Sequence, residues 1–86
     1  MLIYTVMMWD HADTDIMLAT ADREEALKEF ESCVAFSLQV WEKGEVLIEM
    51  INSEGEYFAD GGLERYPEKG QQLFNEIAEQ LQCLIA

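Results

Sequence analysis

The residues best suited to metal chemistry lie in one short polar segment, Asp10–Asp15, which holds three carboxylates and an imidazole. Carboxylate oxygens are the ligands that divalent cations such as Ca²⁺ prefer, so this segment is the candidate cation loop. A calcium loop that began at Asp13 would place Met17 at its fifth position and Leu18 where glycine makes the sharp turn, although Glu24 falls at its twelfth. Because two key positions are apolar, we interpret the segment as a solvated turn between strands and expect no metal site.

Nucleophilic catalysis has little support in this sequence. His11 is the single histidine, so any Ser–His or Cys–His arrangement would have to use it. The glycine pair Gly61–Gly62 lacks the Lys-Ser/Thr of a phosphate-binding loop, and Asp60 and Glu64 beside it would repel a phosphate. We therefore expect no enzymatic activity and no cofactor. The candidate nucleophiles, none of which lies in a nucleophile-elbow motif, are Ser32, Ser37, Ser53, Cys33 and Cys83.

Net charge is the outlying property of the chain. Its 86 residues include eighteen Asp and Glu against five Lys and Arg, which gives a formal net charge of −13. Solubility alone needs a magnitude of only about 2–8 in a small domain. An excess of this size repels nucleic acid and anionic membranes. The composition therefore favours a basic protein surface as the partner and argues against direct binding to nucleic acid or membrane.

Composition also limits the size of the fold and its environment. Half of the residues are hydrophobic, which is ample for one core, and 86 residues are too few for two. We expect a single acidic domain over residues 1–86. The apolar run Leu2–Trp9 is too short to span a bilayer, and Cys33 and Cys83 have neither zinc-site spacing nor the density of a disulfide scaffold. These features predict a cytoplasmic protein whose cysteines are small buried apolar side chains.

Alternating and helical hydrophobic patterns predict the elements that position these side chains. The predicted order, ββαββ(β)α, indicates an α+β fold with an antiparallel sheet of four or five strands. Each helix has one apolar stripe, so both should pack on one face of the sheet and leave the other face partly exposed or free to bind. Strands are expected at residues 2–9, 15–19, 36–41, 46–51 and 56–59, and helices at residues 22–34 and from residue 68 to the C-terminus. The strand at residues 2–9 carries apolar residues at both alternating positions, which predicts an interior strand.

Local signals mark several element ends. Asp22 followed by Glu25 has the spacing of a capping box, so a helix should begin there. Gly44 is available for the positive φ of a turn between two strands. The glycines that follow Asp60, together with Pro67, predict a surface loop between the last strand and the last helix.

The predicted partner-binding residues are acids on the two helices, together with acids and aromatic side chains of the segment Asn52–Lys69. Glu25 and Glu29 lie four apart on one helix, roughly 6 Å from each other, a spacing comparable to that of backbone phosphates. Tyr57, Phe58 and Tyr66 are expected as exposed contacts, because aromatic side chains often dominate interface energetics inside a polar rim. Trp9 and Trp41 are interpreted as core or sheet-face residues. The partner-binding set is Glu24, Glu25, Glu29, Glu54, Glu56, Tyr57, Asp60, Glu64, Tyr66, Glu76 and Glu79.

In size and acidity the chain resembles phage inhibitors of bacterial defence, such as anti-CRISPR and anti-restriction proteins, and immunity proteins of nuclease toxins. The resemblance lies in composition and involves no motif, so it assigns no functional residue. It implies a non-enzymatic DNA mimic, an inhibitor or decoy that docks on a basic nucleic-acid-binding protein. The alternative is a structural or adaptor subunit whose apolar sheet face, suggested by Leu2–Trp9, forms a homodimer or heteromer interface. A third hypothesis, a small metal- or metabolite-binding domain, would rest on Asp13.

Overall fold

The computed structural model describes residues 1–10, 13–31, 37–53 and 56–85, with side chains described for these residues except 9–10, 13–17, 53 and 83–85. The described part has the predicted α+β class and the predicted order, including the optional fifth strand. The elements are β1 (Leu2–Asp10), β2 (Asp13–Thr20), α1 (Arg23–Glu31), β3 (Ser37–Glu42), β4 (Glu45–Ser53), β5 (Glu56–Ala59), the 3₁₀ helix η1 (Leu63–Arg65) and α2 (Glu68–Ile85).

Several boundaries differ from the predicted ones. β1 and β2 pair as far as Asp10 and Asp13, so the polar segment that we interpreted as a loop is mostly strand. The surface loop after Asp60 contains η1. Outside the described residues lie residues 32–34, which we predicted to be helical, residues 54–55, and the side chains of Cys33 and Cys83.

The strands form one antiparallel sheet in the order β2-β1-β3-β4-β5. β1 is therefore an interior strand, as its apolar residues at both alternating positions predicted. Residues that pair across antiparallel strands share a face, so the register defines the inner face of the sheet. It carries the buried side chains Tyr4, Val6, Leu38, Val40, Ile48 and Met50.

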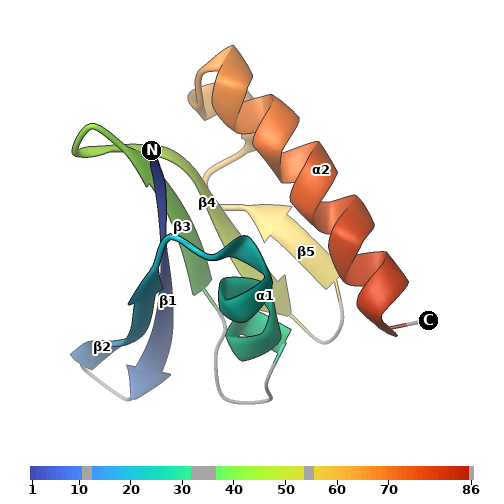
Figure 1. Cartoon of the computed structure of the whole chain (residues 1–86). Coiled ribbons are helices and arrows are strands. Elements are labelled where there is room, and N and C mark those ends of the chain that lie inside the picture. The colour runs from blue at the N-terminus through green and yellow to red at the C-terminus, as the bar shows by residue number, and fades with distance from the viewer. Residues whose placement is uncertain (11–12, 32–36, 54–55, 86) are drawn as a thin grey trace.

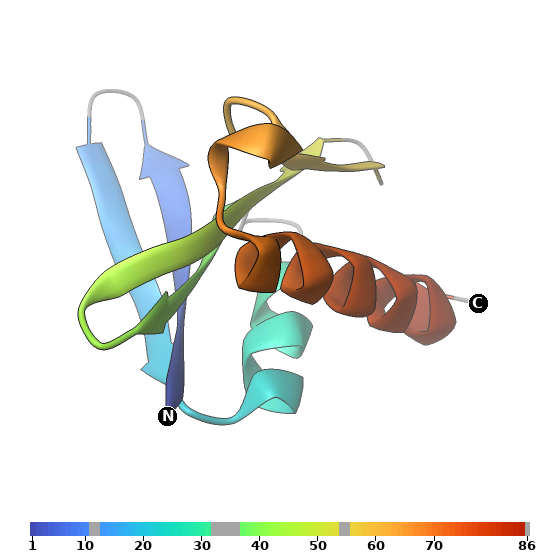
Figure 2. The same ribbon diagram turned by 90° about the horizontal axis from the view of Figure 1, so that it is seen from above.

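Both helices cover this inner face, and the core lies between the two layers (Figures 1 and 2). α1 contacts β1, β2 and β3, whereas α2 lies over β4. Their buried residues recur at helical spacing, which confirms that each helix has one apolar stripe. The helical contribution to the core consists of Ala26, Leu27, Phe30, Leu73, Ile77 and Leu81.

The start of α1 is capped by side chains that satisfy its free amides. Asp22 Oδ1 accepts hydrogen bonds from the backbone amides of Glu24 and Glu25, at 3.0 and 3.4 Å. The Asp22 amide itself donates to Thr20 Oγ1 at 3.0 Å. The predicted cap at Asp22 is confirmed, and Thr20 supplies the acceptor that a capping box would take from Glu25.

Gly70 sets the distance between α2 and the sheet. It is buried, and a Cβ built on it would lie 1.8 Å from the Leu47 carbonyl oxygen. A glycine inside a helix costs about 1 kcal/mol of helix stability relative to alanine. At this position the glycine allows the backbones of α2 and β4 to contact each other.

We expect Gly70→Ala to destabilise the protein by about 1–3 kcal/mol, although alanine is the better helix former, because the added methyl group overlaps the Leu47 carbonyl. Urea unfolding followed by circular dichroism measures this change. The control is Gln72→Ala at an exposed position of α2, where we expect a change within about 0.5 kcal/mol. Equal stabilities of the two variants would contradict a close approach of Gly70 to the Leu47 carbonyl.

Candidate interaction surface

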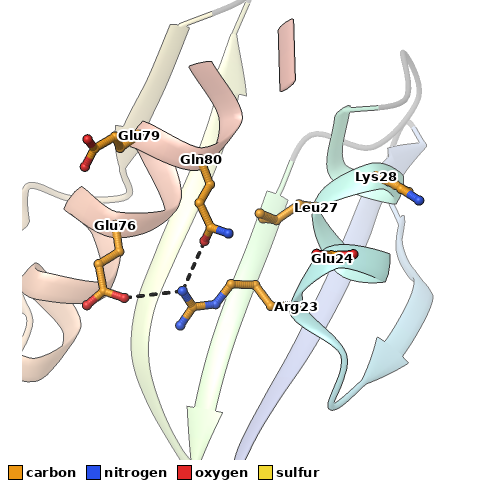
Figure 3. Close-up of a pocket in the computed structure, with 7 residues that line it drawn as sticks. All are labelled: Arg23, Glu24, Leu27, Lys28, Glu76, Glu79 and Gln80. Carbon is orange, nitrogen blue, oxygen red and sulfur yellow. Dashed lines mark hydrogen bonds and ion pairs between the residues drawn. The ribbon is translucent and has the colours of Figure 1, made fainter. Parts of the chain in front are cut away.

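A groove of about 620 Å³ lies between α1 and α2 on the outer side of the helical layer (Figure 3). Each helix contributes residues at positions i, i+3 and i+4, the spacing that places side chains on one helix face. Leu27 points into the groove from α1 but is only 1% exposed, so it offers a partner almost no apolar area. The lining residues are Arg23, Glu24, Leu27, Lys28, Glu76, Glu79 and Gln80.

Arg23 crosses the groove and joins three elements. Its Nη1 donates to Glu76 Oε1 and Gln80 Oε1 of α2, at 3.3 and 3.1 Å. Its Nε donates to the hydroxyl of Tyr4 on β1 at 2.9 Å, and the guanidinium lies 5.8 Å from the centre of the Tyr4 ring. The Arg23–Glu76 ion pair is largely exposed and contributes little by itself. The bond to Tyr4 matters more, because the tyrosine is 3% exposed and losing a hydrogen bond to a buried group costs more than losing an exposed one.

Three of the predicted contact acids border this one groove: Glu24 on α1, and Glu76 and Glu79 on α2. All three are exposed. Glu25 is also exposed on α1 but does not line the groove, and Glu29 is partly buried. The fold thus brings together carboxylates that are about fifty residues apart in the chain, which sequence spacing could not show.

The acids of the segment Asn52–Lys69 lie elsewhere. Glu56 is exposed at the start of β5, Asp60 is exposed after its end, and Glu64 is exposed on η1. None of them lines the groove. Glu54 lies outside the described residues. The predicted contact set therefore divides into a group at the helices and a group around β5 and η1.

The tyrosines of this segment are tied to the protein itself. Tyr66 is partly buried, and its hydroxyl donates to the Asp60 carbonyl oxygen at 2.6 Å. Tyr57 packs on Phe30 with 5.8 Å between ring centres, and its hydroxyl donates to Glu31 Oε1. Phe58, at 50% exposed, is the aromatic side chain of this segment that is available for contact.

Sheet tyrosines hold both ends of α1. Tyr4 of β1 accepts from Arg23, the first residue of the helix, and Tyr57 of β5 donates to Glu31, the last. Burial and the neighbouring Glu31 carboxylate raise the pKa of Tyr57 well above its usual range. The Tyr57 hydroxyl therefore stays protonated and remains a donor at neutral pH.

The face of the sheet opposite the helices, here called the open face, carries a polar row formed by Thr5, Gln39 and Glu49. Thr5 Oγ1 donates to Gln39 Oε1 at 2.7 Å, and Gln39 Nε2 donates to Glu49 Oε2 at 2.5 Å. Ser37 Oγ donates to Glu49 Oε2 at 3.1 Å, and Trp41 Nε1 donates to Thr5 Oγ1 at 2.9 Å. The polar groups at the centre of the open face are thus satisfied within the chain.

The described residues support neither a metal site nor a membrane-spanning helix. No cluster of three or more His, Cys, Asp or Glu side chains there is suited to hold a metal ion. The side chains of Asp10, Asp13 and Asp15, and all of His11, lie outside that description. Within it, neither helix has the length and apolar character that crossing a bilayer requires.

Sequence reasoning did not single out Arg23, Lys28 or Gln80, nor the polar row of the open face. The groove could have been predicted from long polar side chains that recur at i, i+3 and i+4 beside the apolar stripe of each helix. The polar row gave no such signal, because its three members come from three strands.

Comparisons with protein-family models, with curated proteins and with solved structures find no match to this chain.

We expect Arg23→Lys to lower the free energy of unfolding by about 1 kcal/mol, because lysine keeps the charge but cannot reach Tyr4, Glu76 and Gln80 together. Chemical denaturation measures the loss, and hydrogen exchange should increase in α2 around residue 78. Lys28→Arg, at an exposed position in the same groove, is the control. Equal effects of the two variants would show that Arg23 is not a structural link.

The raised pKa of Tyr57 predicts a loss of stability at alkaline pH. The folded state holds this proton more tightly than the unfolded chain does, so the stabilisation is complete below the unfolded pKa of about 10 and is lost as pH rises above it. Urea unfolding at a series of pH values should show a steeper alkaline decline for the wild type than for Tyr57→Phe. Parallel curves would rule out this contribution of Tyr57.

Proposed function

We propose that this chain is a non-enzymatic acidic binding protein of the DNA-mimic inhibitor type, which docks its helical layer on a basic surface of a nucleic-acid-binding protein. The observation that carries the proposal is the gathering of Glu24, Glu76 and Glu79 around one groove, where they outnumber its two bases, Arg23 and Lys28, in a chain with a net charge of −13. The expected cytoplasmic location of the protein belongs to the same proposal.

Rigid placement of these carboxylates supports a docking role. The helices that carry them are anchored by side chains that are buried almost completely, among them Leu27, Phe30 and Ile77. A partner therefore meets carboxylates on helices whose positions are already set, and binding requires little ordering of the backbone. This preorganisation distinguishes the helical layer from a flexible acidic tail.

Charge is expected to act mainly on the rate and salt dependence of binding. An exposed ion pair contributes only about 0.2–1 kcal/mol, so several must form together for useful affinity. Complementary potentials nevertheless accelerate encounter, and they weaken steeply with salt. Since the groove offers little apolar area, we expect fast, salt-sensitive binding to arginine- and lysine-rich surfaces.

The test uses charge reversal at the groove. Glu24→Lys combined with Glu79→Lys should weaken binding of a labelled arginine-rich peptide at least tenfold, a loss of about 1.4 kcal/mol, because both carboxylates border the groove. Fluorescence anisotropy at low salt measures the affinity, and raising the salt to roughly 0.3 M should release the wild-type complex. The wild type should also displace DNA from a basic DNA-binding protein, with the same salt dependence.

A matched control separates a local site from the overall charge. Glu45→Lys combined with Glu68→Lys changes the net charge equally at two exposed positions that do not line the groove. Its affinity for the same peptide should fall no more than about threefold when both double variants are compared at about 0.1 M salt, because the Debye length is then about 10 Å and charges farther away are screened. If both double variants lose affinity equally, the attraction is diffuse and the groove is not the docking site.

A further inference from the structure

In the described part of the chain, no helix covers the open face, because α1 and α2 both pack on the other side of the sheet (Figure 2). Two apolar rows flank the polar row on this face. Val46 at 36% exposed and Phe58 at 50% exposed are two of the three exposed large hydrophobic side chains described, the third being Met1. The rows, placed by strand register, are Met7, Ile51 and Phe58 on one side, with the buried Ser37 between Met7 and Ile51, and Ile3, Trp41 and Val46 on the other.

We propose that a second copy of this chain covers the open face, giving a homodimer in which two sheets pack face to face and the helical layers point outward. Aligned packing of two twisted antiparallel sheets is a common arrangement, with about 10 Å between them. The open face lies on the opposite side of the sheet from the groove, so this dimer is independent of the proposed docking function.

The distribution of charge favours a second copy over a basic partner. Of the acids with described side chains in the strands, only Glu49 and Glu56 lie on the open face, and Glu49 is engaged in the polar row. A basic protein would find few opposite charges here. A copy with the same charge of −13, in contrast, meets least repulsion at a face that carries few of the described acids. Back-to-back packing also keeps the acidic helical layers of the two copies apart.

The polar row suits burial against an identical face. Covering a polar group costs free energy when its hydrogen bond is lost, but Thr5 and Gln39 keep their bonds to each other, to Trp41 and to Glu49. The Glu49 carboxylate accepts from Gln39 and Ser37, and because burying a charge costs more than burying a neutral group, it should stay in contact with water in the dimer. Gln39 is already only 4% exposed in the single chain. The partner copy therefore need not supply hydrogen bonds and can contact the apolar rows on either side.

The size of the face is sufficient for a weak to moderate dimer. Five strands spaced by about 4.8 Å, with about six residues each at 3.3 Å, give a face of roughly 500 Å². Two such faces would bury roughly 1,000 Å² in total, which is near the lower limit of specific interfaces. We therefore expect a dimer that forms in the micromolar range.

Sedimentation velocity of the full chain tests the proposal. At about 100 µM, well above a micromolar Kd, the wild type should sediment with twice the chain mass. Phe58→Asp should raise the dimer Kd at least tenfold, because it places a charge in an apolar row of both copies. Val46→Glu, in the other apolar row, should act in the same way, so a folding defect in one variant does not decide the result.

Gln72→Glu is the matched control, since it adds the same charge at an exposed position of α2 on the opposite layer. It should leave the dimer intact, and circular dichroism should show all variants folded. A wild type that stays monomeric at this concentration overturns the proposal, as does equal weakening by Phe58→Asp and Gln72→Glu. Higher salt should preserve the dimer, whereas it releases the arginine-rich peptide, so each proposal fails by a different measurement.

Discussion

Burial of two helices against one face of a five-stranded sheet is the constraint on which the rest of this structure depends. The chain has little else to oppose the mutual repulsion of its carboxylates, because few bases are present. A fully buried side chain such as Phe30 or Ile77 contributes about 1.5–3 kcal/mol, whereas two like charges four residues apart on a helix cost a few tenths. The free energy from burying the core therefore outweighs the local charge repulsion, and the fold tolerates an acidic surface.

The core also determines where those acids lie. Because Leu27 and Ile77 must face the sheet, Glu24, Glu76 and Glu79 are carried to the outer side of the helices, where α1 and α2 leave a groove. Polar links make this arrangement more specific than apolar packing alone would. Tyr4 of β1 and Tyr57 of β5 lie on the same inner face of the sheet and hold the two ends of α1, and Arg23 extends the first of these links to α2. The acidic groove is thus a consequence of how the core is built.

Using one sheet face for the core leaves the second face with a different character. In the described residues it lacks the helices, carries few of the acids and has central polar groups, Thr5, Gln39 and Glu49, that bond to one another. The acidic helical layer and the open face suit different partners. The helical layer suits a basic protein, and the open face suits a second copy of the chain. The two proposals are compatible, because a dimer through the open face would present two acidic grooves to solvent.

The sequence by itself determined the fold class, the order of the elements, the interior position of β1 and the cap at Asp22, since alternation, helical spacing and capping are local properties of the chain. It also showed the charge excess that motivates the proposed function. It could not show that Glu24 and Glu76 meet at one groove, that Tyr57 turns inward to Glu31, or that Gly70 lies against Leu47. Those contacts join residues more than twenty positions apart, and only the packing of helices on the sheet brings them together. The tertiary structure therefore decided which of many acids share a surface and which face of the sheet stays open.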